Sequence, residues 1–409
     1  MITVQEAIRL ITESLAALGT EELPLGQVQG KVLARDVTAP FALPRFTNAA
    51  MDGFALILDD IRDASDDAPV RLKVTQRIAA GGIATLAVAS GCCAEIMTGA
   101  PLPEGADTVV PFEQSSGFGS EDVEIFKAPK HGANIRYGGE EISVGETLLR
   151  QGSILTPAEI AVLASFGCAS VLVQRAPRVS IVTVGDEVRM PGEELIGAQI
   201  YNCNSFMLDA ACRSVGIVPV GLHHVPDNRA LLRQALALAL AESDVLVTVG
   251  GISSGEYDYV QDELSALGVI KTFWSVAQKP GKPLYYGHTI EGKAVFSLPG
   301  NPVSALVCFV KYCLPAFYAL QAKVCHNSFR AILSNPFPTD KKRHRFLLGK
   351  VWSEGGQLLC TLSPKVESHN ITSLLDANCL AESAPSGDIL PPGSEVLCTW
   401  LPWANMISS

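Results

Sequence analysis

The sequence predicts a multi-domain protein of α/β plus β class, with a central parallel-sheet α/β domain, a β-rich insert domain, a linker domain and a small β-barrel-like domain near the C-terminus. Three observations lead to this prediction. A chain of 409 residues, 48% hydrophobic and 18% charged, can form several buried cores. Strands alternate with helices over residues 177–328, which is typical of a parallel sheet covered on both faces. Short β-rich runs broken by Gly and Pro fill residues 41–139 and 329–409.

The N-terminal segment begins with a predicted amphipathic helix. Thr3 and Glu6 have the spacing of a capping box, which satisfies free backbone N–H groups of the first turn. The apolar residues that share one face of this helix are Val4, Ala7, Ile8, Ile11, Leu15 and Leu18. Residues 1–40 and 140–176 flank the β-rich insert, and we assign both to the linker domain.

A second helix is predicted within the linker domain. Thr156 is a suitable N-cap, Pro157 suits the first turn, and Glu159 can complete a capping box. We expect the helix to continue to Phe166 and to end at Gly167. In the β-rich insert, the most regular strand patterns are residues 70–78 and 108–112.

The α/β domain, residues 177–328, has the clearest pattern. An apolar strand begins at Val179 and ends in Gly185, Asp186 and Glu187. The elements predicted after it are a helix over 206–215, a strand over 218–223, a helix over 229–241 and a strand over 245–249. Ligands of such sheets bind beyond the carboxyl ends of the strands, so the loops at those ends are the first place to look for a site.

Composition excludes several classes of function. A formal net charge of −11 argues against a non-specific nucleic-acid binder, which needs a basic face. Residues 1–10 lack the basic and apolar blocks of a secretory signal, so we expect a cytoplasmic protein. The apolar stretch 303–320 is interrupted by Lys311 and Pro315, which indicates a buried helix and no membrane span. Eleven scattered cysteines without a C-x-x-C pair suggest reduced thiols, with neither a zinc site nor a disulfide framework.

The loop after the strand at 245–249 could bind phosphate. Glycines and hydroxyl side chains let backbone N–H groups approach an anion closely, and the residues concerned are Gly250, Gly251, Ser253 and Gly255. The simpler interpretation is that the glycines only turn the chain. Asp258, which follows them, favours a functional loop.

Two further loops are candidates for anion binding. Asn301 and Pro302, after Pro299, are typical of an N-cap and a first helical residue, so the free N–H groups of that helix would face the turn. An ordinary capped helix start would have the same sequence. Lys279 and Lys282 lie in a stiff Lys-Pro-Gly-Lys-Pro loop, where fixed ammonium groups suit an oxyanion, although surface lysines are usually only solvated.

Four acidic residues lie in loops and could together hold Mg²⁺, which binds through carboxylates and substrate phosphates. They are Asp52, Glu187, Asp227 and Asp258. Asp227 has an alternative interpretation, because it could simply cap the helix that begins at Asn228.

Taken together, the motifs resemble the molybdopterin molybdenumtransferase family, whose eukaryotic relative is the catalytic domain of gephyrin. The motifs lie in the family's order, and they are PRFTNAAMDGF (44–54), IMTGAPLPEGADTVV (96–110), VTVGDEV (182–188), VGGISSGEYDY (249–259), KPGKP (279–283), LPGNPVSA (298–305) and SHNITSLLDAN (368–378). The resemblance covers essentially the whole chain.

This resemblance implies a homodimer of four-domain subunits, with dimerisation through the linker domain, that inserts molybdate into adenylated molybdopterin and releases AMP with Mg²⁺. The α/β domain would bind molybdopterin, and the cleft would be completed across the dimer interface. The catalytic residues implied are Asp52, Thr98, Glu187, Asp227 and Asp258, the carboxylates among them holding the metal. The residues implied around molybdate and phosphates are Lys279, Lys282, Pro299, Asn301, Pro302 and Ser368. Partners would be the molybdopterin adenylyltransferase and molybdoenzyme chaperones.

Some features depart from the family pattern. Glu141 stands where the family has Asp, and Ser254 adds a hydroxyl to the glycine loop. The family's Phe-x-Arg pattern near Leu348 is missing, which leaves Arg343, Arg345 or Lys350 for the oxyanion contact. Two other functions remain open: a molybdopterin adenylyltransferase, and a non-catalytic scaffold of the gephyrin kind.

Overall fold

The structure is a computed structural model that describes residues 1–252, 259–324 and 327–404. The chain divides into two compact units that are described separately. The larger unit comprises Met1–Ala34, Gly152–Thr156 and Ser170–Ser409, and the smaller one Arg35–Gln151 and Pro157–Ala169.

The smaller unit is built on a five-stranded sheet with the strand order β7-β4-β6-β5-β8. Its strands are β4 (Gly53–Leu56), β5 (Val70–Ile78), β6 (Cys92–Ile96), β7 (Thr108–Pro111) and β8 (Asp122–Ile125). Each face of the sheet carries its own buried cluster of apolar side chains. The predicted strand over 70–78 is confirmed, and the strand at 108 ends at Pro111, one residue earlier than expected, because the 3₁₀ turn η3 (Phe112–Gln114) follows.

The rest of the smaller unit consists of short elements. They are β2 (Val37–Thr38) paired with β10 (Thr147–Leu149), β3 (Asn48–Ala49) paired with β9 (Ile135–Arg136), η2 (Leu58–Ile61) and α2 (Pro157–Ser165). The predicted second helix is thus confirmed, and it ends one residue before Phe166.

The larger unit begins with α1 (Val4–Glu13), whose N-cap is Thr3 as predicted. The Thr3 hydroxyl accepts a hydrogen bond from the Glu6 N–H at 3.1 Å. The helix ends at Glu13, so the prediction that Leu15 and Leu18 belong to it was wrong; both pack against the same core from outside the helix. The η1 turn (Leu25–Gln27) and a pair of antiparallel strands, β1 (Thr20–Pro24) and β11 (Ser170–Gln174), follow.

A six-stranded sheet with the order β15-β12-β16-β20-β19-β17 forms the α/β layer. Its strands are β12 (Val179–Val184), β15 (Gly221–Val225), β16 (Val245–Val249), β17 (Ile270–Trp274), β19 (Tyr285–His288) and β20 (Ala294–Leu298). The first four strands in this order are parallel, whereas β19 and β17 pair antiparallel at one edge. The strand predicted over 218–223 instead begins at Gly221, because its pairing with β12 starts there.

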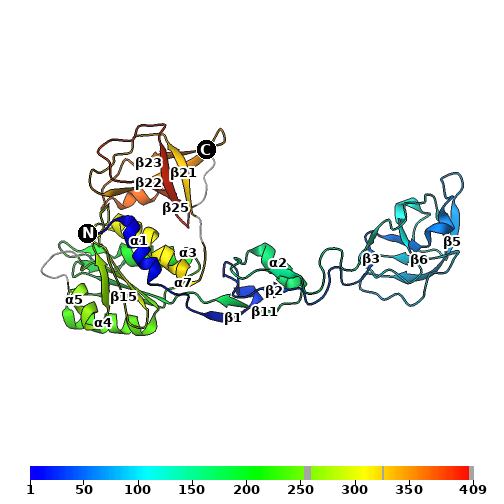
Figure 1. Ribbon diagram of the computed structural model, residues 1–409, viewed down its shortest axis with the longest axis horizontal. Coiled ribbons are helices and arrows are strands. Elements are labelled where there is room, and N and C mark those ends of the chain that lie inside the picture. Colours follow the sequence, from blue (N-terminus) through cyan, green and yellow to red (C-terminus); the bar gives the residue numbers. More distant parts are fainter. Residues whose placement is uncertain (253–258, 325–326, 405–409) are drawn as a thin grey trace. The chain divides into compact units, whose positions relative to one another are not determined.

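Helices cover both faces of this sheet (Figure 1). One face packs against α1, α3 (Cys203–Ser214), α6 (Pro302–Cys308), the π-helical turn η4 (Phe309–Cys313) and α7 (Leu314–Leu320). The other face packs against α4 (Arg229–Glu242) and α5 (Val260–Ala266). The segment Pro302–Leu320 is long and apolar enough to cross a membrane, but 83% of it is buried within the protein, as predicted for a core helix.

The last part of the chain forms a small closed barrel. Its strands are β21 (Ser328–Leu333), β22 (His344–Glu354), β23 (Gln357–Leu362), β24 (Cys379–Ser383) and β25 (Glu395–Trp400), and pairing of β22 with β24 closes it. Outside the barrel, β18 (Gln278–Lys279) pairs with β22, and η5 (Ile371–Leu374) connects β23 with β24. The remaining pair, β13 (Val188–Arg189) and β14 (Ile200–Tyr201), precedes α3.

A buried ion cluster joins the barrel to the α/β layer. Lys311 of η4 donates to Glu382 of β24 at 3.0 Å, and His344 Nε2 lies 3.0 Å from the other oxygen of that carboxylate. Burial alone would raise the pKa of Glu382, but its contacts with His344 and Lys311 outweigh this effect and lower it. Together these two contacts keep this carboxylate charged away from water.

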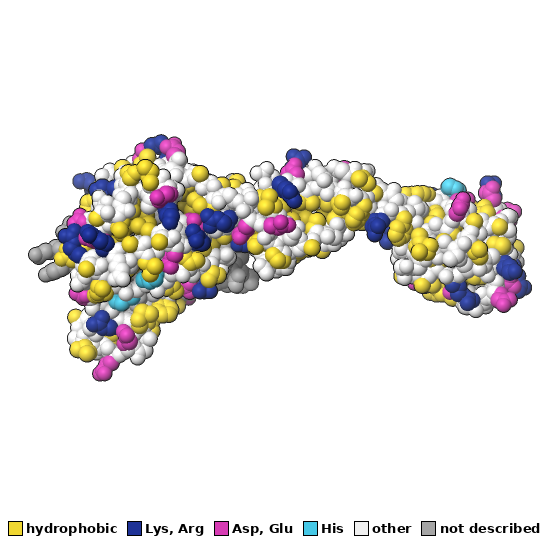
Figure 2. Space-filling model, turned by 90° about the horizontal axis from the view of Figure 1, so that it is seen from below, with side chains coloured by type: hydrophobic (Ala, Val, Ile, Leu, Met, Phe, Trp, Pro, Cys, Tyr) yellow, Lys and Arg dark blue, Asp and Glu magenta, His cyan; other side chains and the backbone are white. Residues whose placement is uncertain are grey.

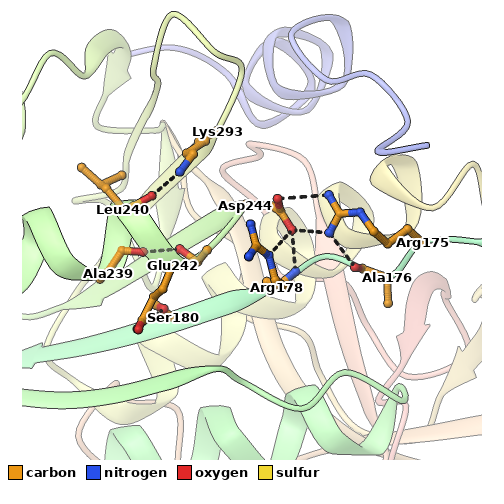
Figure 3. A network of polar contacts seen from close by, with 10 residues as sticks. Arg175, Ala176, Arg178, Ser180, Ala239, Leu240, Glu242, Asp244 and Lys293 are labelled. Carbon is orange, nitrogen blue, oxygen red and sulfur yellow. Dashed lines mark hydrogen bonds and ion pairs between the residues drawn. The ribbon is translucent and has the colours of Figure 1, made fainter. Parts of the chain in front are cut away.

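A second network fixes the point where the chain enters the α/β sheet (Figure 3). Arg175 donates two hydrogen bonds to the Asp244 carboxylate, at 2.8 and 3.1 Å, and the Arg178 backbone N–H donates a third at 2.8 Å. Burial would raise the pKa of Asp244, yet these bonds together lower it. Asp244 directly precedes β16, so the network holds the start of a central strand.

We predict that Asp244→Asn lowers the free energy of unfolding by about 2 kcal/mol at neutral pH, as expected for losing charge-assisted hydrogen bonds. Because the folded pKa is lowered, this stabilisation is present above the unfolded pKa of about 3.9 and disappears as the pH falls below it. Urea denaturation at several pH values measures the difference. The control Asp209→Asn breaks only the surface pair with Arg213 and should cost less than about 0.5 kcal/mol.

Candidate functional site

A hollow of the α/β layer lies beyond the carboxyl ends of three neighbouring parallel strands. It has a volume of about 750 Å³. It is lined by the turns that follow β12, β16 and β20, together with the start of α3 and residues near η5. The predicted site residues that line it are Glu187, Asp227, Gly250, Gly251, Pro299, Asn301 and Pro302.

The turns after β12 and β15 each place one acidic residue in the pocket lining, Glu187 and Asp227. The backbone N–H of Asp186 donates to the Asp227 carboxylate, and the N–H of Asp227 donates to the Asp186 carboxylate, both at 3.0 Å. Asp227 therefore does not cap α4. The cap is Asn228, whose side chain accepts from the N–H groups of Ala230 and Leu231. This excludes the helix-capping interpretation of Asp227.

The turn after β16 requires glycine. Gly250 has φ +89°, and a Cβ on it would lie 2.5 Å from the carbonyl oxygen of Val184. Its N–H donates to the Leu298 carbonyl at 3.1 Å, which links the turn to β20. Gly251 also has a positive φ, of +64°. The other predicted residues of this loop, Ser253, Gly255 and Asp258, lie outside the described residues.

The turn after β20 holds Asn301, which was predicted as a helix N-cap. It occupies that position, yet its side chain caps nothing and donates instead to the Ser368 hydroxyl at 3.2 Å. The Gly300 carbonyl accepts from the Asn204 side chain at 2.7 Å. The Asn301 side chain therefore does not cap the free N–H groups of the first turn of α6 and binds Ser368 instead. This hydrogen bond holds Ser368, another predicted site residue, at the rim of the pocket.

The predicted cationic residues do not line this pocket. Pro283 reaches the lining, but Lys279 and Lys282 do not belong to it. Lys282 instead lines a separate hollow of about 530 Å³, whose other basic residues are Lys341, Lys342 and Arg343. Over the face seen in Figure 2, charged side chains of both signs are interspersed with hydrophobic ones.

Arg345 stands out among the three candidates for the oxyanion contact. It is only 7% exposed, and within the described chain its Nε has no hydrogen-bond partner. Strand pairing places it opposite Lys279. Burial lowers its pKa from the ordinary value. Arg343 is already bound to Asp340, whereas Lys350 lines a different pocket, next to Gly349.

Asp52 and Thr98 belong to the smaller unit, where they form a close pair. The backbone N–H and the hydroxyl of Thr98 both donate to one Asp52 oxygen, at 2.7 and 2.6 Å. These two bonds lower the pKa of Asp52. The carboxylate is therefore oriented and ionised at neutral pH, with its second oxygen free of the Thr98 contacts.

Glu187 and Asp227 are the described carboxylates in this pocket with donor atoms of the kind that magnesium prefers. No three Asp, Glu or His ligand atoms gather within 4.8 Å in the part of the chain that the structure describes. Glu187 and Asp227 nevertheless face one pocket. Mg²⁺ commonly uses one or two protein carboxylates and completes its octahedron with water and substrate phosphates. Two carboxylates are enough for that arrangement.

Several pocket residues were missed from the sequence: Tyr201, Asn202, Asn204 and His369 also line the hollow. Asn202 is the N-cap of α3 and donates to the Thr183 hydroxyl at 2.9 Å. The helix predicted over 206–215 in fact begins three residues earlier, at Cys203, so Asn202 did not stand out as its cap. Asn204 and His369 gave no local signal, because only the tertiary fold brings them to the pocket.

The sequence matches three family descriptions in succession. Residues 2–167 match the MoeA N-terminal region (domain I and II), residues 180–319 a probable molybdopterin binding domain, and residues 330–401 the MoeA C-terminal region (domain IV). A protein of Mycobacterium tuberculosis called molybdopterin molybdenumtransferase 2 is 35% identical over 391 residues, covering 93% of this chain and 95% of the relative. The molybdopterin molybdenumtransferase of Bacillus subtilis is 32% identical over 398 residues, with 96% and 91% covered.

A solved structure gives the same result for the fold. The crystal structure of the molybdopterin biosynthesis MoeA protein from Pyrococcus horikosii superposes with a TM-score of 0.82 at 30% identity, covering 98% of this chain and 99% of the other.

We predict that Gly250→Ala destabilises the protein by more than about 2 kcal/mol, because the substitution adds a backbone clash to the strain of a positive φ. Thermal and urea unfolding measure the loss. Gly216→Ala is the matched control: Gly216 has φ +78° but nothing within 4 Å of its Cβ position, so its cost should stay near about 1 kcal/mol. Equal losses for the two variants would contradict the proposed close approach of Gly250 to Val184.

Proposed function

The chain belongs to the MoeA family of molybdopterin molybdenumtransferases, and from this premise we propose that it transfers molybdenum from molybdate to adenylated molybdopterin with release of AMP. The protein is a transferase of molybdenum cofactor biosynthesis. The single observation that carries the specific reaction is the pocket of about 750 Å³, in which glycine turns and acidic side chains converge at the carboxyl ends of β12, β16 and β20.

The pocket suits a nucleotide phosphate bridge. The turn at Gly250 and Gly251 exposes backbone without side-chain cover. The Gly250 N–H is already bonded to the Leu298 carbonyl, and such a turn lets the N–H groups that follow it contact phosphate oxygens. The N-terminal end of α6, behind Asn301 and Pro302, adds a favourable dipole for an anion. In this proposal the pterin nucleotide lies in the pocket with its phosphates against these two turns.

Glu187 and Asp227 would hold Mg²⁺ together with the substrate phosphates. Asp258, which follows Gly250 and Gly251 in the sequence, would contribute a third carboxylate. When bound, Mg²⁺ would neutralise charge on the phosphate bridge as AMP leaves. The paired bonds between Asp186 and Asp227 would keep the latter carboxylate oriented. Asp52, oriented by Thr98, would complete the acidic set, and we propose that a second copy of the chain supplies it in a homodimer.

The second substrate, molybdate, needs cationic contacts. We assign these to Lys279, Lys282 and Arg345, with the hydroxyl of Ser368 beside them. The unpartnered Nε of buried Arg345 supports this assignment, because a buried guanidinium N–H without a partner is costly and an oxyanion would satisfy it. The cytoplasm is the proposed compartment, and the adenylyltransferase that makes the nucleotide substrate is a proposed partner, as are molybdoenzyme chaperones that receive the product.

A single assay tests the proposal. Purified protein is incubated with adenylated molybdopterin, Mg²⁺ and molybdate, and both AMP release and molybdenum incorporation are followed. We expect the two in equal amounts. ATP-dependent adenylation of molybdopterin without metal insertion would instead identify an adenylyltransferase. Neither activity in a folded protein would indicate a scaffold.

We predict that Glu187→Gln lowers kcat by about 100-fold or more, because it removes a charge that positions the metal and the phosphates. The substitution keeps nearly the same shape, so folding should be unaffected. Steady-state AMP release measures kcat. Glu194→Gln, an exposed residue outside the pocket lining, is the control and should keep wild-type turnover.

We further predict that Arg345→Met raises the KM for molybdate by about 10-fold or more, since one charge-assisted hydrogen bond to the oxyanion is lost. The KM for adenylated molybdopterin should change much less. The control is Lys271→Met, because Lys271 is exposed on the edge strand β17. An equal rise in both KM values would show that Arg345 affects both substrates alike and would contradict a specific molybdate contact.

A further inference from the structure

The interior of the C-terminal barrel contains three cysteines from three different strands. Cys360 of β23, Cys379 of β24 and Cys398 of β25 are each fully buried. Their three sulfur atoms all lie within 4.8 Å of one another. Among the described residues, this is the one group of three or more potential metal ligands with this spacing.

We propose that Cys360, Cys379 and Cys398 form a trigonal sulfur site for a soft, thiophilic monovalent ion of the Cu(I) type. This site is separate from the pocket of the proposed transferase reaction. The proposal also goes beyond that reaction, because it would hold even if the pocket had another substrate.

The spacing of the sulfurs suits a three-coordinate ion. Metal–thiolate bonds of about 2.3 Å place three ligands around a central ion about 4 Å apart, so a contraction of less than about 1 Å is enough to bind. A glycine of a neighbouring strand lies directly against two of the sulfurs. A Cβ on Gly349 of β22 would lie 3.0 Å from the Cys360 sulfur and 3.2 Å from that of Cys379.

The donor set selects the kind of ion. Sulfur ligands favour Cu(I) and Zn²⁺ over hard cations. Structural zinc sites have four protein ligands, whereas the described group has three members in an apolar interior, where the neighbours include Leu333, Val351 and Leu362. Cu(I) does not need a fourth ligand, so it fits the site better than zinc.

Ion binding would change the protonation of the site. The thiolate is the form of cysteine that binds a metal ion. Any sulfur that becomes a thiolate on binding therefore releases its proton to solvent.

Access to the site also has a structural basis. Gly349 and Thr361, which lie next to the sulfurs, line a hollow of about 240 Å³ at the outside of the barrel. Gly349, which has no side chain, therefore lies between this hollow and two of the thiols. Local opening of β22 would let an ion pass from one to the other.

The test uses the reduced, metal-free full-length chain, titrated with Cu(I) against the chelator bathocuproine disulfonate without oxygen. We expect one tightly held Cu(I) per chain, a higher unfolding temperature on binding, and a loss of affinity of about 100-fold or more in Cys379→Ala and Cys398→Ala. Cys93→Ala, which removes an equally buried thiol from the smaller unit, is the matched control and should bind like wild type.

Equal Cu(I) affinity in the cluster and control variants would overturn the proposal, as would tighter binding of Zn²⁺ than of Cu(I). If the cluster variants do not fold, X-ray absorption of the wild-type complex decides the question. Three sulfur neighbours around copper support the site, whereas two sulfurs or nitrogen donors contradict it. None of these results depends on the transferase assay, so the two proposals can fail separately.

Discussion

The register of three parallel strands determines where the pocket can be. Thr183 of β12 pairs with Val249 of β16, and Val249 pairs with Leu298 of β20, so the three strands end side by side. The turns that follow them must then meet at one edge of the sheet. A shift of one residue in β16 would move its turn by about 3.3 Å and reverse the direction of every side chain. The half-buried network of Arg175 and Asp244 holds the start of β16, at the opposite end of the strand from the pocket, and so helps to keep that register.

The order of the elements and the turns of the pocket could be predicted from the sequence because they rest on local signals. Apolar runs and helical spacing gave β16 and α4 almost to the residue, and glycine marked the turn at Gly250. The capping residue Thr3 was also evident from its spacing to Glu6. These signals need only neighbours in sequence. These signals fail where strand pairing sets the boundary of an element. The start of β15 at Gly221, for example, depends on its partner β12 and not on local hydrophobicity.

The remainder of the site depends on contacts between distant residues, which no local pattern reveals. Asp227 looked like a helix cap, but the cap is the next residue, Asn228, and Asp227 is held by Asp186 from 41 positions away. Successive cysteines of the barrel are 19 residues apart in the sequence, so they form no short motif that would predict their contact. Roles for Asp52 and Asp258 remain predictions, because one belongs to the smaller unit and the other lies outside the described residues.

In the proposed reaction the barrel would take part directly, through Arg345. Among the residues that the structure describes, the pocket lining carries the acids Glu187 and Asp227 but no lysine or arginine, although both proposed substrates are anions. Pairing of β18 with β22 brings Arg345 of the barrel opposite Lys279, and the buried cluster of Lys311, Glu382 and His344 fixes β22 and β24 against η4. If that attachment loosened, the acids would keep their places on the sheet while Arg345 moved away. The ion cluster would therefore act on molybdate binding through position alone, since none of its three members lines the pocket.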